Sequence, residues 1–186
     1  TSATVQTVDF AGKTSGNVTY NATSNGSWQM TGSHTTSGTL TLTKGTLDTN
    51  GQTASWSTLS SSNANVRTLT LGASSITVDG SWTTTTTTNL TFNSNTSTIT
   101  FSSSGIFSGG GLTFNNVSLT GATPEIAGAN TFANLTRTGT ASKTNTFELS
   151  SNQTITGTLT INGNSTVNRI LVMSVTLGSA RTLTAA

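Results

Sequence analysis

The chain has 186 residues, a length that allows one domain with its own core. Its formal net charge is +2, and only 6% of its residues are charged. Cysteine is absent, so a disulfide framework and a thiolate metal site are both excluded. The basic residues are scattered and form no stripe that could neutralise a phosphate backbone, so we expect no nucleic-acid partner. They are Lys13, Lys44, Arg67, Arg137, Lys143, Arg169 and Arg181.

The N-terminal stretch has a weak pattern. Val5, Val8 and Phe10 are apolar, and the turn-favouring Gly12 and Gly16 follow them. We therefore expect residues 1–17 to form a looser first coil within a single domain that spans residues 1–186. Because the sequence starts at Thr1 without Met, we expect a mature product or a segment of a longer chain.

From Val18 onwards, one short motif recurs, in which an apolar residue is followed by Thr and in most copies by a second apolar residue. Its first positions are Val18, Leu40, Leu69, Leu90, Leu112, Leu135, Leu159 and Leu183. A nearly constant step in the low twenties, with alternating apolar and polar positions, is typical of a solenoid of short strands. The step between Leu40 and Leu69 is longer than the others, which predicts an extra loop near Asn50-Gly51 or residues 60–62.

Each period contains one or two further apolar groups, separated by Gly, Asn and Ser. This pattern predicts an all-β fold, a right-handed parallel β-helix (β-solenoid) with coils of about 21–24 residues. An antiparallel sandwich would also place turn residues at short intervals, but the constant motif favours the solenoid. Trp28, Trp56, Trp82 and Tyr20 fall at apolar positions, so we expect them in the core.

The residue after each motif start is always threonine: Thr19, Thr41, Thr70, Thr91, Thr113, Thr136, Thr160 and Thr184. We call these eight the predicted threonine row and expect them to point outward on one face. Such an array resembles the surface of solenoidal ice-binding proteins, whose hydroxyls and methyls order water. The structural alternative is that threonine is simply a favourable exposed strand residue.

Catalytic residues are not evident. The acidic residues, Asp9, Asp48, Asp79, Glu125 and Glu148, are isolated in the sequence, whereas glycoside hydrolysis needs two carboxylates about 5–10 Å apart. Asp48 and Asp79 are the pair that could stack on consecutive coils. His34 is expected on a surface loop, without partners for a triad or a metal site. We predict no enzyme, no cofactor and no metal, and no membrane span, because the longest apolar run is Ile170–Met173.

Residues 45–53 and 67–72, and then residues 130–135 and 154–163, resemble the β-helix repeat regions of bacteriophage virion proteins of the tail-fibre and tailspike type. Similar sequences occur in secreted bacterial adhesins and filaments. The resemblance, which covers most of residues 38–186, implies a structural, non-enzymatic module of a phage particle or extracellular filament. It also implies virion or extracellular localisation, self-association as an oligomer or fibre, and contact with a host surface or glycan. Two alternatives remain, an ice-binding or adhesin module using the threonine row and a polysaccharide-degrading, tailspike-like enzyme.

Overall fold

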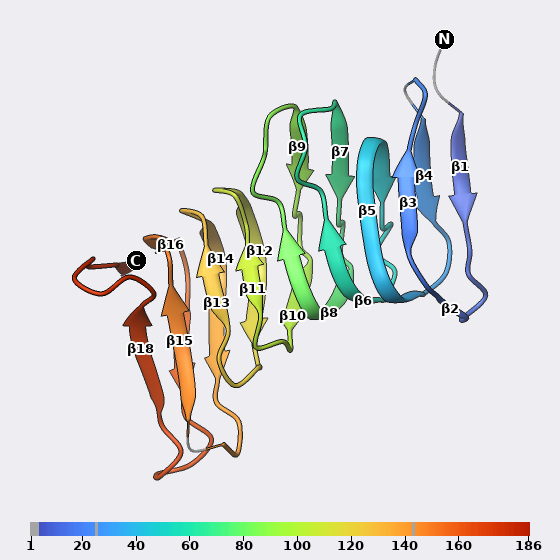
Figure 1. Cartoon of the computed structure of the whole chain (residues 1–186). Helices are drawn as coiled ribbons and strands as arrows, with labels where there is room; N and C mark the ends of the chain where they lie inside the picture. Colours follow the sequence, from blue (N-terminus) through green and yellow to red (C-terminus); the bar gives the residue numbers. More distant parts are fainter. Residues whose placement is uncertain (1–3, 25, 143) are drawn as a thin grey trace.

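The computed structural model describes residues 4–24, 26–142 and 144–186, which form strands and turns without a helix (Figure 1). The strands are β1 (Val5–Val8), β2 (Thr14–Ser15), β3 (Val18–Asn21), β4 (Ser27–Met30), β5 (His34–Asp48), β6 (Ala54–Ser60), β7 (Arg67–Thr70), β8 (Ser75–Thr83), β9 (Leu90–Asn93), β10 (Thr98–Phe101), β11 (Ile106–Ser108), β12 (Thr113–Leu119), β13 (Glu125–Ala127), β14 (Thr131–Thr138), β15 (Asn145–Leu149), β16 (Gln153–Ile155), β17 (Leu159–Asn162), β18 (Ile170–Ser174) and β19 (Leu183–Ala185).

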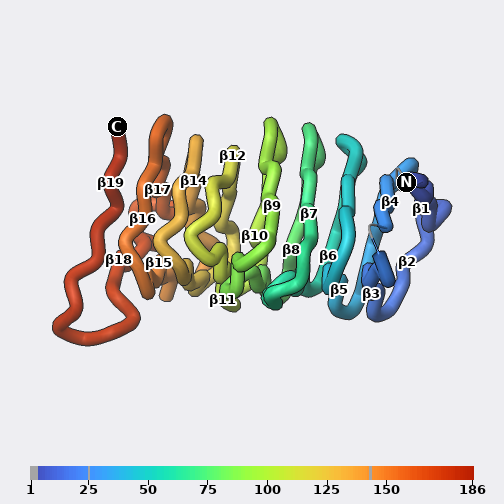
Figure 2. Tube along the Cα trace, turned by 90° about the horizontal axis from the view of Figure 1, so that it is seen from above, coloured from blue at the N-terminus to red at the C-terminus, as the bar shows by residue number. Residues whose placement is uncertain are grey.

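The chain winds through three faces in turn, and each coil pairs in parallel with the coils on either side (Figures 1 and 2). Face A contains β1, β4, the end of β5, β7 and β9, and it continues in the starts of β12 and β14, β16 and β19. Face B contains β2, the starts of β5, β6 and β8, β10, the ends of β12 and β14, and β17. Face C contains β3, the middle of β5, the ends of β6 and β8, β11, β13, β15 and β18.

This topology confirms the predicted parallel β-solenoid. The coil length varies more than the sequence pattern predicts, because the corners between faces differ in length. The coil that leads from Thr100 to its partner Ser118 is short, whereas the coil that leads from Thr154 to its partner Thr184 is much longer. Adjacent strands lie about 4.8 Å apart, so eight coils form a rod about 40 Å long.

Close approach between coils explains a glycine at one corner. A Cβ atom on Gly121 would lie 1.8 Å from the carbonyl oxygen of Ser103 in the preceding coil. Only glycine lets the two backbones come so near.

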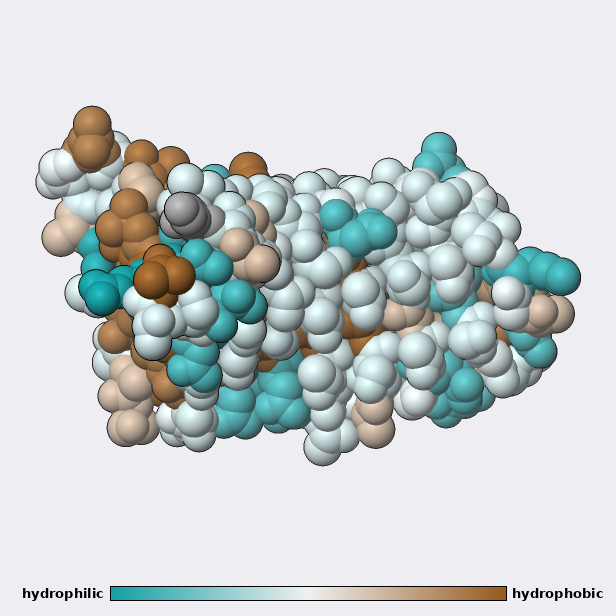
Figure 3. Space-filling view, turned by 90° about the horizontal axis from the view of Figure 1, so that it is seen from below, coloured by the Kyte–Doolittle hydropathy of each residue, from teal (hydrophilic) through white to brown (hydrophobic). Residues whose placement is uncertain are grey.

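In the view of Figure 3, residues of intermediate hydropathy cover the middle of the rod, as the Ser- and Thr-rich composition predicts.

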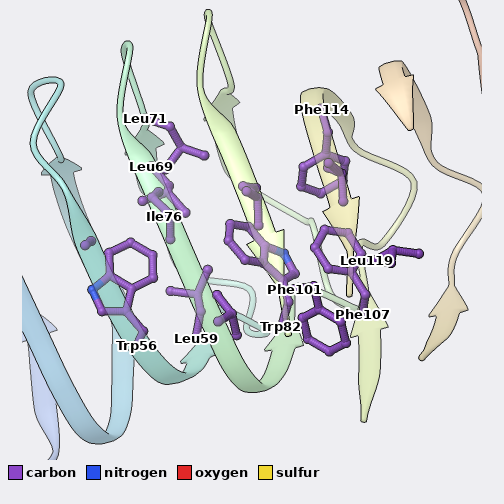
Figure 4. Close-up of a cluster of buried hydrophobic side chains, with 14 of the residues drawn as sticks. Trp56, Leu59, Leu69, Leu71, Ile76, Trp82, Phe101, Phe107, Phe114 and Leu119 are labelled. Atoms are coloured by element: carbon purple, nitrogen blue, oxygen red, sulfur yellow. The ribbon is translucent and has the colours of Figure 1, made fainter. Parts of the chain in front are cut away.

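The core fills the space between the three faces along the rod. Strand alternation points every second residue inward, and these positions carry Leu, Ile, Val and aromatic side chains. Trp56, Trp82, Phe101 and Phe107 are fully buried, as Figure 4 illustrates, which confirms the predicted core role of the first two. Each buried large side chain contributes roughly 1.5–3 kcal/mol through burial.

The outcome for the other two predicted core aromatics is similar. Tyr20 is 4% exposed, and Trp28 is partly buried against the core.

The structure contains no helix, within the described residues, that is long and apolar enough to cross a membrane.

Candidate functional site

The predicted threonine row does not form one row, because the motif occurs on all three faces. Thr19 and Thr41 are partners on face C, and Thr136 and Thr160 are partners on face B. The remaining four lie on face A, where Thr70 pairs with Asp48 and Asn93, Thr91 with Thr68, Thr113 with Thr131 and Thr184 with Thr154. The expectation of a single eight-residue face was therefore wrong.

The same register shows that the long step from Leu40 to Leu69 is not an insertion. Leu40 lies on face C and pairs with Leu59, whereas Leu69 lies on face A and pairs with Leu47. The two residues are not equivalent positions of successive coils, so the extra loop predicted between them was a misinterpretation.

A continuous row of outward hydroxyls does exist on face B. Its members pair one after another along eight strands, and we call them the face B hydroxyl row: Thr14, Thr35, Ser55, Thr77, Thr100, Ser118, Thr136 and Thr160. Among the described residues, no hydrogen bond joins these hydroxyls to another protein group, and all eight residues are exposed or partly exposed. Only Thr136 and Thr160 belong to both the predicted and the observed row.

A second polar row runs beside the first, two residues earlier on each strand. Ser75, Thr98, Asn116 and Asn134 are successive partners there. The Asn134 Nδ2 atom donates to Asn116 Oδ1 at 2.8 Å, and Asn116 Nδ2 donates to Thr98 Oγ1 at 3.4 Å. These bonds fix the second row internally. Together the rows form an uncharged lattice with spacings of about 4.8 Å across strands and about 6.6 Å along them.

The acidic residues take an arrangement that the sequence reasoning missed. Asp48 and Asp79 do not stack, because Asp48 pairs with Gln29 and Thr70 on face A while Asp79 follows the face B segment of β8. Instead, Glu125 and Glu148 are direct partners on face C. Their separation along the chain is close to the repeat length of the motif, and this was the signal that could have revealed them.

The two glutamates are held by neighbouring hydroxyls. Thr146 Oγ1 donates to Glu148 Oε1 at 2.9 Å, and the Ser150 hydroxyl donates to Glu125. Three surface hollows on the described rod are not lined by Asp or Glu, although Thr146 lines one of them. No group of three or more His, Asp or Glu side chains that could hold a metal occurs among the described residues.

His34 is a buried residue, which corrects its expected place on a surface loop. Its ring stacks on Phe10 with a centroid distance of 3.9 Å, and Nε2 lies 3.5 Å from Ser15 Oγ. The Nδ1 atom is buried without a hydrogen-bond partner. Burial lowers the pKa of His34 to about 4, so the imidazole is neutral near pH 7.

In the part of the chain that the structure describes, Arg67 and Arg137 are buried inside the solenoid and have no carboxylate partner. Arg67 Nε donates to Ser61 Oγ at 2.8 Å, and its other four donors reach the backbone carbonyls of Ser61, Asn65, Thr86 and Thr88. Arg137 likewise donates to the carbonyls of Leu119, Ala122, Thr138 and Thr146, which explains a charged residue at an inward position.

Burial lowers the pKa of both guanidinium groups from the usual value. Because every N–H donor of the two side chains is bonded within the protein, these arginines stabilise the corners of the solenoid and are not available to bind a ligand.

Comparison with known proteins gave no family model that matches the chain, and neither the curated proteins nor the solved structures contained a match.

Proposed function

We propose that this chain is a non-enzymatic structural module, a rigid β-solenoid rod of a phage tail fibre or spike or of an extracellular filament. The observation that carries the proposal is the continuity of the core, which runs from Tyr20 near one end to Ile155 near the other. Parallel ladders join successive coils over the same distance. A rod of this kind spaces and displays whatever is attached to it, in a virion or outside the cell.

The surroundings of the carboxylates support a role without catalysis. Glu148 accepts a hydrogen bond from a hydroxyl of its own strand, and Glu125 accepts one from a hydroxyl of the next coil. Both lie on face C, and neither lines one of the three hollows. A glycosidase needs one carboxylic acid and one carboxylate on opposite sides of a bound sugar.

Duplicating one coil tests the spacer role. Residues 113–130 make up one coil of this region, because Thr113 pairs with Thr131. A second copy of this segment, inserted after residue 130, should give a folded rod that is about 4.8 Å longer by small-angle scattering. Release of reducing ends from a panel of polysaccharides by the natural chain, lost in Glu125→Gln or Glu148→Gln, would overturn the proposal.

A second candidate function, binding to an ordered surface such as ice, is favoured by the face B hydroxyl row. Its hydroxyls carry no charge and repeat about every 4.8 Å from strand to strand, so they form a regular array. Substituting both Thr77 and Thr100 by lysine should abolish ice shaping and thermal hysteresis. The matched control substitutes Thr41 and Thr83 on face C, and equal activity of the two double variants would refute this candidate.

A further inference from the structure

The C-terminal end of the rod gathers most of the exposed large apolar side chains. Six of the nine that the structure describes lie there: Ile161, Val167, Leu171, Val172, Val175 and Leu177. Figure 3 shows these hydrophobic atoms concentrated at one end, the end that holds the C-terminus in Figure 2.

Part of this exposure comes from inward positions that no coil covers. Val172 pairs with the fully buried Phe147 and is itself 41% exposed. Ile161 pairs with the fully buried Arg137 and is 37% exposed. Both side chains point toward the rod axis, as their partners do, so one more coil stacked on this end would bury them.

The backbone at this end is also unpaired on its outer side. Among the described residues, β17 pairs only with β14, β18 only with β15, and β19 only with β16. Each strand therefore presents a free edge of N–H and C=O groups, which is a template for another parallel strand. A hollow of about 500 Å³, lined by residues that include Val167, Ile170 and Leu171, lies beside β18.

The N-terminal end presents the complementary half of such an interface. There, within the described part of the chain, β1 pairs only with β4, and β2 and β3 pair only with β5. The inward residues Val8 and Val18 are partly buried against the core, because neighbours cover them on one side only. Strand order and direction are the same at both ends, since the whole rod is built from one repeated parallel coil.

We propose that the C-terminal end binds the N-terminal end of a second copy of this chain, so that the rods stack head to tail. In the joined state β19 extends face A onto β1, β17 extends face B onto β2, and β18 extends face C onto β3. The interface continues the coil-on-coil contact that forms the rod itself. It is heterologous and does not close on itself, so it generates filaments. The inference rests on the proposed structural role and names its partner.

The test blocks each end separately. In sedimentation velocity and electron microscopy, the natural chain should form linear assemblies whose mass rises with concentration. The variant Val172→Lys blocks the C-terminal end and Gln6→Lys, at an exposed inward position opposite Trp28, blocks the N-terminal end. Each variant alone should remain at 18.9 kDa. Ile161→Lys and Val18→Lys are second variants for the two ends, and Thr83→Lys on face C in the middle of the rod is the control that should still assemble.

Mixing the two blocked variants gives the decisive result. One intact C-terminal end and one intact N-terminal end remain in the mixture, so the head-to-tail interface predicts dimers and nothing larger. A natural chain that stays monomeric at all concentrations would overturn the inference while leaving the rod intact, as would a Gln6→Lys variant that dimerises by itself through two C-terminal ends. Particles that are not rods would overturn the proposed function as well.

Discussion

Arg67 offers a quantitative test of how the corners of this solenoid are held. Its guanidinium is 1% exposed and uses all five N–H donors, at distances from 2.6 to 3.0 Å. Substitution by methionine keeps a side chain of similar length but removes every donor. Asn65, Thr86 and Thr88 are exposed, so water can hydrate their carbonyl groups. Ser61 is buried, and its carbonyl group would lose its donor, whereas its hydroxyl would still donate to the carbonyl of Leu42 at 3.1 Å.

A buried acceptor without a donor costs about 1–3 kcal/mol, so Arg67→Met should lower the free energy of unfolding by about that amount. Urea denaturation followed by circular dichroism measures this difference. Arg67→Lys should be no better, because an ammonium cannot reproduce the planar fork. The exposed Arg181→Met is the control and should change stability by less than about 0.5 kcal/mol. A loss at Arg67 as small as in the control would refute the reasoning.

Three further predictions concern the core and the coil contacts. His34 binds a proton more weakly in the folded chain than in the unfolded one, so the free energy of unfolding should fall as the pH drops from about 6.5 to 4, by at most about 3 kcal/mol. Urea denaturation at several pH values should show that this pH dependence is weaker in His34→Leu, and an unchanged pH dependence would contradict the prediction. Trp82→Ala should cost about 3–5 kcal/mol in the same assay, because the ring packs on Phe107 and Phe114, and a cost below about 1 kcal/mol would argue against this packing. Gly121→Ala should lower the free energy of unfolding by about 1–3 kcal/mol, because the added Cβ forces two coils apart. In the control, Gly16→Ala, the added Cβ meets nothing within 4 Å, so the melting temperature should not fall. Equal effects of the two substitutions would contradict the close approach at Gly121.

The sequence pattern predicted the parallel solenoid because inward apolar and outward polar residues alternate in every strand. It could not assign strands to faces, because all three faces use the same alternation. Val18 and Leu40 belong to face C, Leu69 to face A and Leu135 to face B, although all four start the same motif. Corner length also varies, from the single residue Asn115 inside β12 to the whole loop between β18 and β19, so spacing along the chain does not measure position around the rod.

The sequence predicted the type of candidate site but not which residues form it. A flat array of outward hydroxyls was expected, but its members had to come from the strand register, which adds residues such as Thr77 and Thr100 that do not belong to the recurring motif. The buried arginines carried a local signal, since Arg67 and Arg137 stand two residues from Leu69 and Leu135 and thus share their inward direction. His34 carried no comparable signal, because its neighbours are all polar and its burial depends on Phe10 in the preceding coil.

The register of face B is the central structural claim, and a distance between two spin labels tests it most directly. The chain lacks cysteine, so the double variant Thr35→Cys, Thr160→Cys can be labelled without a background. These positions are six rungs apart, through Ser55, Thr77, Thr100, Ser118 and Thr136. At about 4.8 Å per rung, a rigid rod predicts one narrow distance distribution, with about 29 Å between the two Cβ atoms. A broad distribution, or a distance of half that value, would contradict the stacked solenoid.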